Sequence, residues 1–153
     1  PTEPDARIRQ WIRGGLQQTS LTPDAMNTVE EHCLHLLNNT LSCKTGRWIL
    51  SAHPEAQSEL ALSRMESGEL KGYVIDRTFV DSETGFRWII DYKTSAPLVD
   101  ESLDSFTARE HAHYREQLQN YAELLAEQTG AEPHAAIKTA LYFPSIKMLS
   151  LTP

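Results

Sequence analysis

The sequence contains only two cysteines, Cys33 and Cys43, in 153 residues. Two thiols are too few for a disulfide framework or for a structural zinc site of the usual four ligands. An iron–sulfur cluster needs four thiolates, so we expect no iron–sulfur cluster. Reduced thiols are typical of an intracellular protein, and we therefore expect a cytoplasmic location.

Three other kinds of segment are missing. No apolar run approaches the roughly 20 residues that span a bilayer, so we expect no membrane partner. No signal-peptide pattern opens the chain. No phosphate-binding loop of the kind an ATP-driven motor needs is present. Because the first residue is Pro1 rather than Met, we expect the chain to be a fragment of a longer protein.

Positive charge is also scarce, since the formal net charge is -7. This is the wrong sign for a domain that holds nucleic acid by bulk electrostatics. It does not exclude a nucleic-acid enzyme, because a site built of carboxylates is locally acidic. With 40% hydrophobic and 23% charged residues, the composition fits a folded globular domain.

Two helices are predicted in the N-terminal part of the chain. Apolar residues recur at helical spacing over residues 4–18 and again from Pro23 to about Thr40. Thr22 fits the N-cap of the second helix, with Pro23 at its first position. The apolar run at 48–50 and the polar turn at 51–55 follow, and no element is assigned there.

The rest of the chain alternates between predicted strands and one long helix. Three strands joined by short turns precede a helix over about 107–128, which Gly130 and Pro133 end. A last strand runs from Ala136 to Phe143. The three earlier strands are expected at 58–64, 71–80 and 86–94. Helices, a meander, a helix and a strand predict a mixed α/β fold.

Two charged residues near the end of the third strand suggest a site. Alternate residues of a strand share a face, so Asp91 and Lys93 project together. Folding the hairpin about Glu83 brings residue 76 opposite residue 90 or 91, within one residue of register. Asp76 therefore comes beside Asp91.

Such a pair of carboxylates points to a metal. Two close carboxylates repel each other, and a hard divalent cation between them removes the conflict. Lys93 would then orient or deprotonate an attacking water, or stabilise the phosphate in the transition state. Glu59, on the preceding strand, is a candidate third carboxylate.

A purely structural interpretation is the alternative. Asp91 and Lys93 would form a surface ion pair, and Asp76 would pair with Arg77 or Arg87. Each residue taken singly favours this interpretation. The three together, at matched spacing after apolar runs, favour the metal site.

The stretch "GYVIDRTFVDSETGFRWIIDYKTS" followed by "YREQLQNYAELL" resembles the nuclease module of RecB/AddA-type helicase–nucleases. These proteins are members of the PD-(D/E)XK superfamily, and the similarity runs from about residue 48 to 143. "GYVID" and "IIDYK" imply that Asp76 and Asp91 bind metal and that Lys93 is the catalytic lysine. "QLQNY" implies that Gln117 and Tyr121 support the site from the following helix.

The resemblance also implies a fold and a domain division. The expected fold is α/β, a restriction-endonuclease-like core with a central mixed sheet in the order αβββαβ and extra N-terminal helices. The core is expected at 47–153, and the helical segment at 1–46. The segment "WILSAHPEAQSELALS" looks like the lead into the first core strand, with Glu59 at an acidic position. Arg77 should point to the other face, as a phosphate contact or a salt bridge.

One part of the family pattern is not matched. Many relatives take a further metal ligand from a histidine on an upstream helix. The surroundings of His32 and His35 do not match that motif, and we expect neither to bind metal. His53 lies nearer the core elements. A position before Pro1 would also fit this ligand, and the resemblance leaves it open.

The resemblance implies a magnesium-dependent deoxyribonuclease, exodeoxyribonuclease-like, with manganese able to replace magnesium. It would be the C-terminal part of an ATP-dependent helicase–nuclease in DNA recombination and repair. DNA and the helicase portion of the same or a partner chain would be its partners. The alternative is a catalytically inactive nuclease-like module that binds DNA or a helicase. The retained Asp-x-Lys pattern argues against that alternative.

Overall fold

A five-stranded mixed sheet forms the centre of the computed structural model, which describes residues 3–130 and 137–152, with side chains from residue 6 onward. The strands lie in the order β1–β2–β3–β4–β5, and only β3 and β4 run parallel. Their bounds are β1 Gln57–Glu66, β2 Glu69–Val80, β3 Arg87–Tyr92, β4 Ile137–Phe143 and β5 Met148–Leu151. The predicted mixed α/β fold is confirmed.

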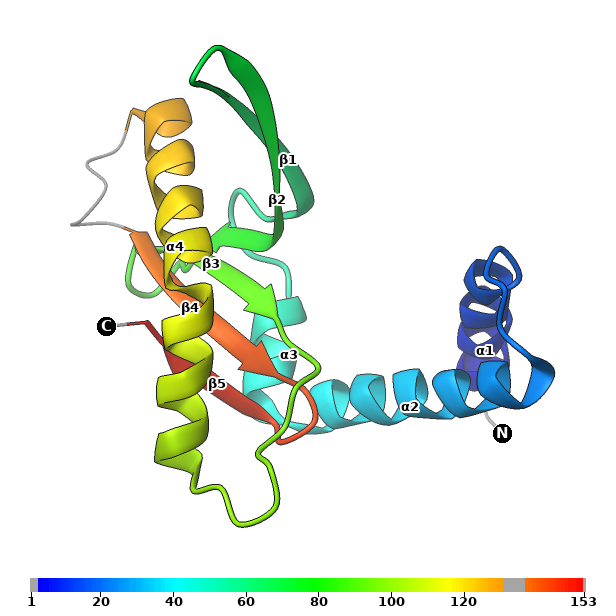
Figure 1. Ribbon diagram of the computed structural model, residues 1–153. Coiled ribbons are helices and arrows are strands. Elements are labelled where there is room, and N and C mark those ends of the chain that lie inside the picture. The colour runs from blue at the N-terminus through cyan, green and yellow to red at the C-terminus, as the bar shows by residue number, and fades with distance from the viewer. Residues whose placement is uncertain (1–2, 131–136, 153) are drawn as a thin grey trace.

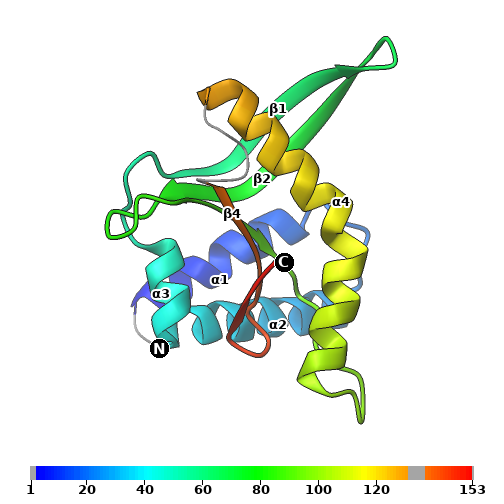
Figure 2. The same cartoon turned by 90° about the vertical axis from the view of Figure 1, so that its left-hand side faces the viewer.

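Helices cover the two faces of this sheet. The long helix α4, Leu103–Thr129, lies across one face, and the short helix α3, Lys44–Leu50, lies on the other (Figure 2). Each face has its own buried cluster: Ile89 belongs to the cluster under α4 and Ile90 to the cluster under α3. Adjacent residues of one strand therefore contribute to opposite cores, as the pleat requires.

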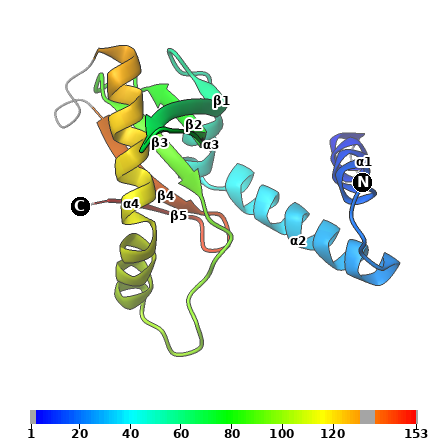
Figure 3. The same cartoon turned by 45° about the horizontal axis from the view of Figure 1, so that its top comes forward.

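The first two helices form an arm that projects from this body (Figures 1 and 3). They are α1, Glu3–Leu16, and α2, Pro23–Ser42. As predicted, Thr22 caps α2: its side chain accepts a hydrogen bond from the Ala25 amide at 3.3 Å. Buried Glu30 of α2 accepts hydrogen bonds from Arg9 and Arg13 of α1 and joins the two helices.

Two elements were missed from the sequence. Helix α3 is only seven residues long, too short to show a helical period, and its N-cap is Cys43, whose sulfur accepts a hydrogen bond from the Gly46 amide at 3.2 Å. Strand β5 has four residues, too few to show alternation. The proposed boundary between residues 46 and 47 falls inside α3.

The predicted ends of the other elements differ by a few residues. Strand β3 ends at Tyr92 rather than at residue 94, although the Lys93 amide still donates to the Tyr142 carbonyl of β4 at 2.9 Å. Gly130 ends α4 in the left-handed conformation, with φ of 65°. The expected roles of Pro133 and Ala136 lie outside the described residues.

Within the described part of the chain, no helix combines the length and the apolar character that crossing a membrane requires.

Candidate active site

The β2–β3 hairpin brings the two predicted aspartates together. The last pair of its ladder joins Arg77 with Ile90. One step further, this register places Asp76 opposite Asp91. The register expected from folding the hairpin about its loop is therefore confirmed, and the two carboxylates come from neighbouring strands at one end of the sheet.

An irregularity in β1 and β2 directs Asp76 toward α4. Ile75 packs in the cluster under α4 and Phe79 in the cluster under α3, although residues four apart in a regular strand share a face. The strand must therefore change face between them. At this level Glu59 of β1, opposite Asp76 in the register, has a positive φ of 53°. Such local disruptions of a ladder re-aim side chains, often beside functional sites.

Asp91 is a buried carboxylate, with a relative exposure of 2%. Its Oδ2 faces the Lys93 ammonium at 2.5 Å but accepts no well-aligned hydrogen bond within the described residues. Burial raises the pKa of Asp91; the Lys93 ammonium opposes the shift and the Asp76 charge adds to it. Among the residues that the structure describes, the Lys93 ammonium is the one cation paired with this carboxylate.

Asp76 is half-buried and ties the two strands together. Its Oδ2 accepts a hydrogen bond from the Tyr92 amide at 2.8 Å. Burial raises the pKa of Tyr92 to about 12, while the Arg77 charge opposes this shift and the Asp76 charge contributes to it. The phenol therefore stays neutral at physiological pH and adds no charge beside the two aspartates.

A divalent cation fits this donor set. Asp91 offers a buried oxygen that, within the described residues, accepts no well-aligned hydrogen bond, and Asp76 offers a second carboxylate from the adjacent strand. In the described residues, no group of three or more His, Cys, Asp or Glu side chains is placed to hold a metal. Magnesium, however, commonly uses one or two carboxylates and completes its shell with water and substrate phosphate oxygens.

Helix α4 supplies the other wall of the site. The Tyr114 ring lies under the Lys93 ammonium, 3.8 Å from Nζ to the ring centroid. Such a cation–π contact orients the lysine while leaving its charge unneutralised. This contact of Tyr114 was not predicted from the sequence, although Tyr114 lies three residues before Gln117 on the same helix.

Gln117 and Tyr121 lie together on α4. The Gln117 amide Nε2 donates to the Tyr121 hydroxyl at 2.7 Å, and the buried Tyr121 ring packs edge-to-face against Tyr73. Burial raises the pKa of Tyr121; the Gln117 hydrogen bond opposes the shift, and the charges of Asp91 and Asp76 add to it. This pair therefore lies within electrostatic reach of both aspartates.

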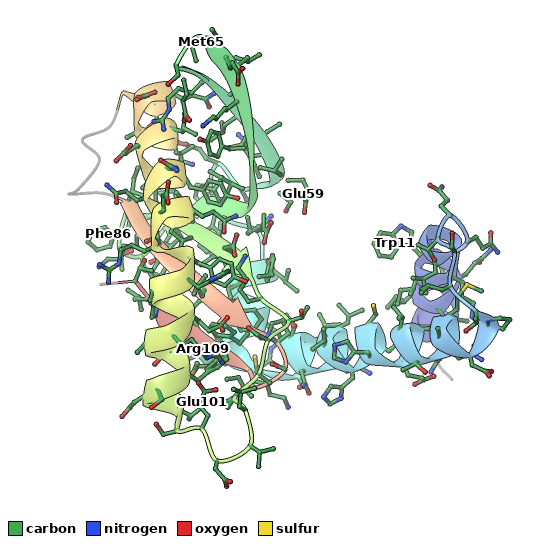
Figure 4. The ribbon with its side chains drawn as sticks, viewed as in Figure 1. Trp11, Glu59, Met65, Phe86, Glu101 and Arg109 are labelled. Carbon is green, nitrogen blue, oxygen red and sulfur yellow. The ribbon has the colours of Figure 1, made fainter. Side chains whose placement is uncertain are left out.

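Glu59 and Arg77 are placed differently. Glu59 is exposed, lies at the edge of β1 away from α4 (Figure 4), and forms no three-carboxylate group with the aspartates. Arg77 points to the opposite face, as expected. There it donates to the carbonyls of Ile49 and Ser51 and to the Ser58 hydroxyl, so it joins β2 to the end of α3 and to β1.

Within the described residues, His32, His35 and His53 belong to no group of three or more side chains placed to hold a metal. His32 and His35 are exposed on α2. His53 contacts the Trp48 carbonyl at 2.6 Å and stacks on Phe79, with ring centroids 4.1 Å apart. Its contacts place it in the layer between the sheet and α3, on the face opposite Lys93.

Comparison with known proteins agrees with this geometry. No curated protein gives a significant match. The family described as the PD-(D/E)XK nuclease superfamily matches residues 1–150, nearly the whole chain. The five-stranded mixed sheet with its flanking helices is consistent with the restriction-endonuclease-like fold of that superfamily. The chain belongs to the PD-(D/E)XK nuclease superfamily.

Proposed function

We propose that this chain is a magnesium-dependent DNA nuclease domain that hydrolyses phosphodiester bonds. The observation that carries the proposal is the placement of Asp76 and Asp91 on neighbouring strands with Lys93 against Asp91. Membership of a nuclease superfamily and the divalent metals typical of its members support the same conclusion. Manganese, which accepts the same oxygen ligands, would replace magnesium.

Asp76 and Asp91 would hold the cation. When bound, magnesium draws electron density from the phosphate, lowers the pKa of a coordinated water and neutralises developing charge. The Asp91 Oδ2 faces only the Lys93 ammonium among the described residues, so accepting a ligand bond would require that one ion pair to open. Asp76 keeps its Oδ2 on the Tyr92 amide, which fixes the direction of its carboxylate.

Lys93 has two tasks in this proposal. In the metal-free protein it is the counter-ion of Asp91, and it would leave the carboxylate if a cation took that position. Its ammonium, guided by the Tyr114 ring, then lies beside the phosphate and positions the attacking water or stabilises the charge of the pentavalent transition state. Gln117 and Tyr121 would hold that wall of the site in place. Glu59 is exposed and Arg77 is engaged by carbonyls, so we give neither a direct step.

The wider context is also a proposal. "IIDYK" and "QLQNY" resemble motifs of RecB/AddA-type enzymes, and the described part of the chain has no ATP-binding loop in its sequence. We infer that the domain acts as an exodeoxyribonuclease in the cytoplasm. A helicase in the same or a partner chain would deliver DNA to it during recombination and repair. That helicase would supply the basic surface that a chain of net charge -7 does not offer.

The experiment is cleavage of end-labelled single- and double-stranded DNA with magnesium, manganese or EDTA. Wild-type protein should give metal-dependent products, and Lys93→Ala should lower the rate by roughly 10²- to 10⁴-fold, the range expected for a positioned proton-transfer group. Lys71→Ala is the matched control. It removes the same charge from β2, where Lys71 pairs with Glu66 of β1. Equal rates for wild type and Lys93→Ala would contradict the proposal, and no cleavage would indicate a binding module.

A further inference from the structure

The hydroxyl and the carbonyl of Ser95, two residues after Lys93, are both hydrogen-bonded. Its hydroxyl donates to Oε2 of Glu110 on α4 at 2.7 Å. Its carbonyl accepts a hydrogen bond from the Ser145 hydroxyl, in the turn between β4 and β5, at 2.8 Å. Two residues earlier, the Lys93 amide donates to the Tyr142 carbonyl. The backbone around Lys93 is thus fixed by β4 before it and by α4 and the β4–β5 turn after it.

Glu110 is a buried carboxylate that the proposed reaction does not use. Its side chain is 6% exposed, and its second oxygen accepts a hydrogen bond from Arg109 at 2.5 Å. Arg109 also binds Glu101 through two hydrogen bonds of 3.0 Å, near the start of α4 (Figure 4). A buried carboxylate is costly unless it is paired and hydrogen-bonded, so this placement constrains what lies around it.

Glu110 stands in line with the site residues of α4. Glu110, Tyr114, Gln117 and Tyr121 follow spacings of four, three and four residues, which places them along one side of the helix. Glu110 holds Ser95, and Tyr114 lies under the Lys93 ammonium one turn further on. The same helix therefore contacts both the main-chain segment that follows Lys93 and its side-chain tip.

We propose that Glu110 and Ser95 are positioning residues that set the location of Lys93 through the Ser95–Glu110 hydrogen bond. Neither would touch DNA or the cation. The inference rests on the proposed nuclease function. It explains why an acidic side chain is buried where the chain leaves the site, and it predicts that the hydrogen bond, not the charge of Glu110, is what the reaction needs.

The test compares Glu110→Ala, Glu110→Gln and Ser95→Ala with wild type in the DNA cleavage assay. A displaced Lys93 should lower kcat by roughly 10- to 100-fold, since small misplacements of reacting groups have effects of that size. KM for DNA should change little in Glu110→Ala and Ser95→Ala. Glu110→Gln keeps an acceptor for the Ser95 hydroxyl and should restore most of kcat. Thr107→Ala is the control, because it removes from α4 a hydroxyl that donates to the Leu103 and Asp104 carbonyls and not to Ser95, and it should cleave like wild type.

Wild-type kcat in both Glu110→Ala and Ser95→Ala would overturn the inference, as would a loss that comes from KM alone. A loss equally large in Glu110→Gln would also overturn it. Should Glu110→Ala fail to fold, Ser95→Ala decides, because it removes only one hydroxyl.

Hydrogen exchange separates this inference from the proposed function. The Lys93 amide, which donates to Tyr142, should exchange faster in Glu110→Ala than in Glu110→Gln, whether or not the protein cleaves DNA. If the wild type does not cleave DNA, the nuclease proposal is wrong. Faster exchange of the Lys93 amide in Glu110→Ala than in Glu110→Gln would still support the positioning role. Equal exchange in the two variants would contradict that role.

Discussion

At the scale of single residues, the site is defined by a conflict between burial and charge. Asp91 is buried with only the Lys93 ammonium against its Oδ2, and its pKa is raised in the folded protein. A carboxyl group with a raised folded pKa binds its proton more tightly in the folded than in the unfolded state. Its contribution to the stability of the fold is therefore fully present below the pKa that the group has in the unfolded chain. That contribution falls as the pH rises through the pKa that the group has in the folded protein. The metal-free protein carries this penalty in full once the pH exceeds the folded pKa of Asp91.

We therefore expect Asp91→Asn to raise the melting temperature in EDTA, because the amide removes the buried charge. Functional sites commonly lower stability in this way. Excess magnesium should stabilise the wild type by mass action, by about 2.7 kcal/mol at a hundredfold excess over Kd. It should leave Asp91→Asn unchanged. Thermal unfolding at neutral pH, with EDTA and with magnesium, measures both effects.

Asp81→Asn is the control for that prediction. Asp81 is also buried, but hydrogen bonds, chiefly from the Thr84 hydroxyl, lower its pKa. Its folded state favours the charged form, so the same substitution should lower the melting temperature at neutral pH. A lower melting temperature for Asp91→Asn in EDTA would mean that the Lys93 ion pair outweighs the burial, contrary to our interpretation.

At the scale of elements, the junction of α2 and α3 depends on one glycine. A Cβ built on Gly46 would lie 2.2 Å from the Thr40 carbonyl oxygen and 2.8 Å from the Thr40 Cγ2. Backbone cannot yield as the end of a flexible side chain can. The junction matters because Arg77 of β2 donates to the carbonyl of Ile49 in α3 and to the carbonyl of Ser51, the residue that caps α3.

Gly46→Ala should therefore destabilise the fold by about 1–3 kcal/mol or more, the usual cost of overpacking. The matched control is Gly14→Ala in α1, where a new Cβ would meet nothing within 4 Å. That change should stabilise α1 by about 0.5–1 kcal/mol, the usual difference between glycine and alanine inside a helix. Urea unfolding of both variants measures whether the free energy of unfolding falls in Gly46→Ala and rises in Gly14→Ala. Similar effects for both glycines would show that close packing at Gly46 is not the cause.

The elements also show what could be predicted from sequence. The placement of Asp76 opposite Asp91 could be predicted because hairpin register and strand alternation are set by short-range geometry that the sequence displays. The contacts of Tyr114 with Lys93 and of Glu110 with Ser95 were missed because they depend on how α4 lies over the sheet. The face change beside Glu59 could not be read either, since a positive φ at a glutamate has no sequence signature. Short α3 and β5 are fixed by tertiary packing and not by their own periodicity.

At the scale of the whole molecule, the arm and the body differ in how they are held. The body has a buried cluster on each face of its sheet, whereas α1 packs chiefly against α2. The contact between the two arm helices includes the buried Glu30 carboxylate and its hydrogen bonds from Arg9 and Arg13. Trp11 of α1 is 81% exposed (Figure 4). Segments with few buried contacts open at lower free energy than core strands.

We therefore expect the amides of α1 to exchange with solvent much faster than those of β3 and β4. Glu30→Gln should accelerate exchange in α1 further, because the amide carries no charge to pair with Arg9 and Arg13. Exchange in β3 and β4 should stay at the wild-type rate, because neither strand depends on that contact. Hydrogen exchange read by mass spectrometry resolves these segments. If Glu30→Gln accelerated exchange in β3 and β4 as much as in α1, the arm and the body would unfold as one cooperative unit. The domain division that we propose near residue 46 would then have no energetic basis.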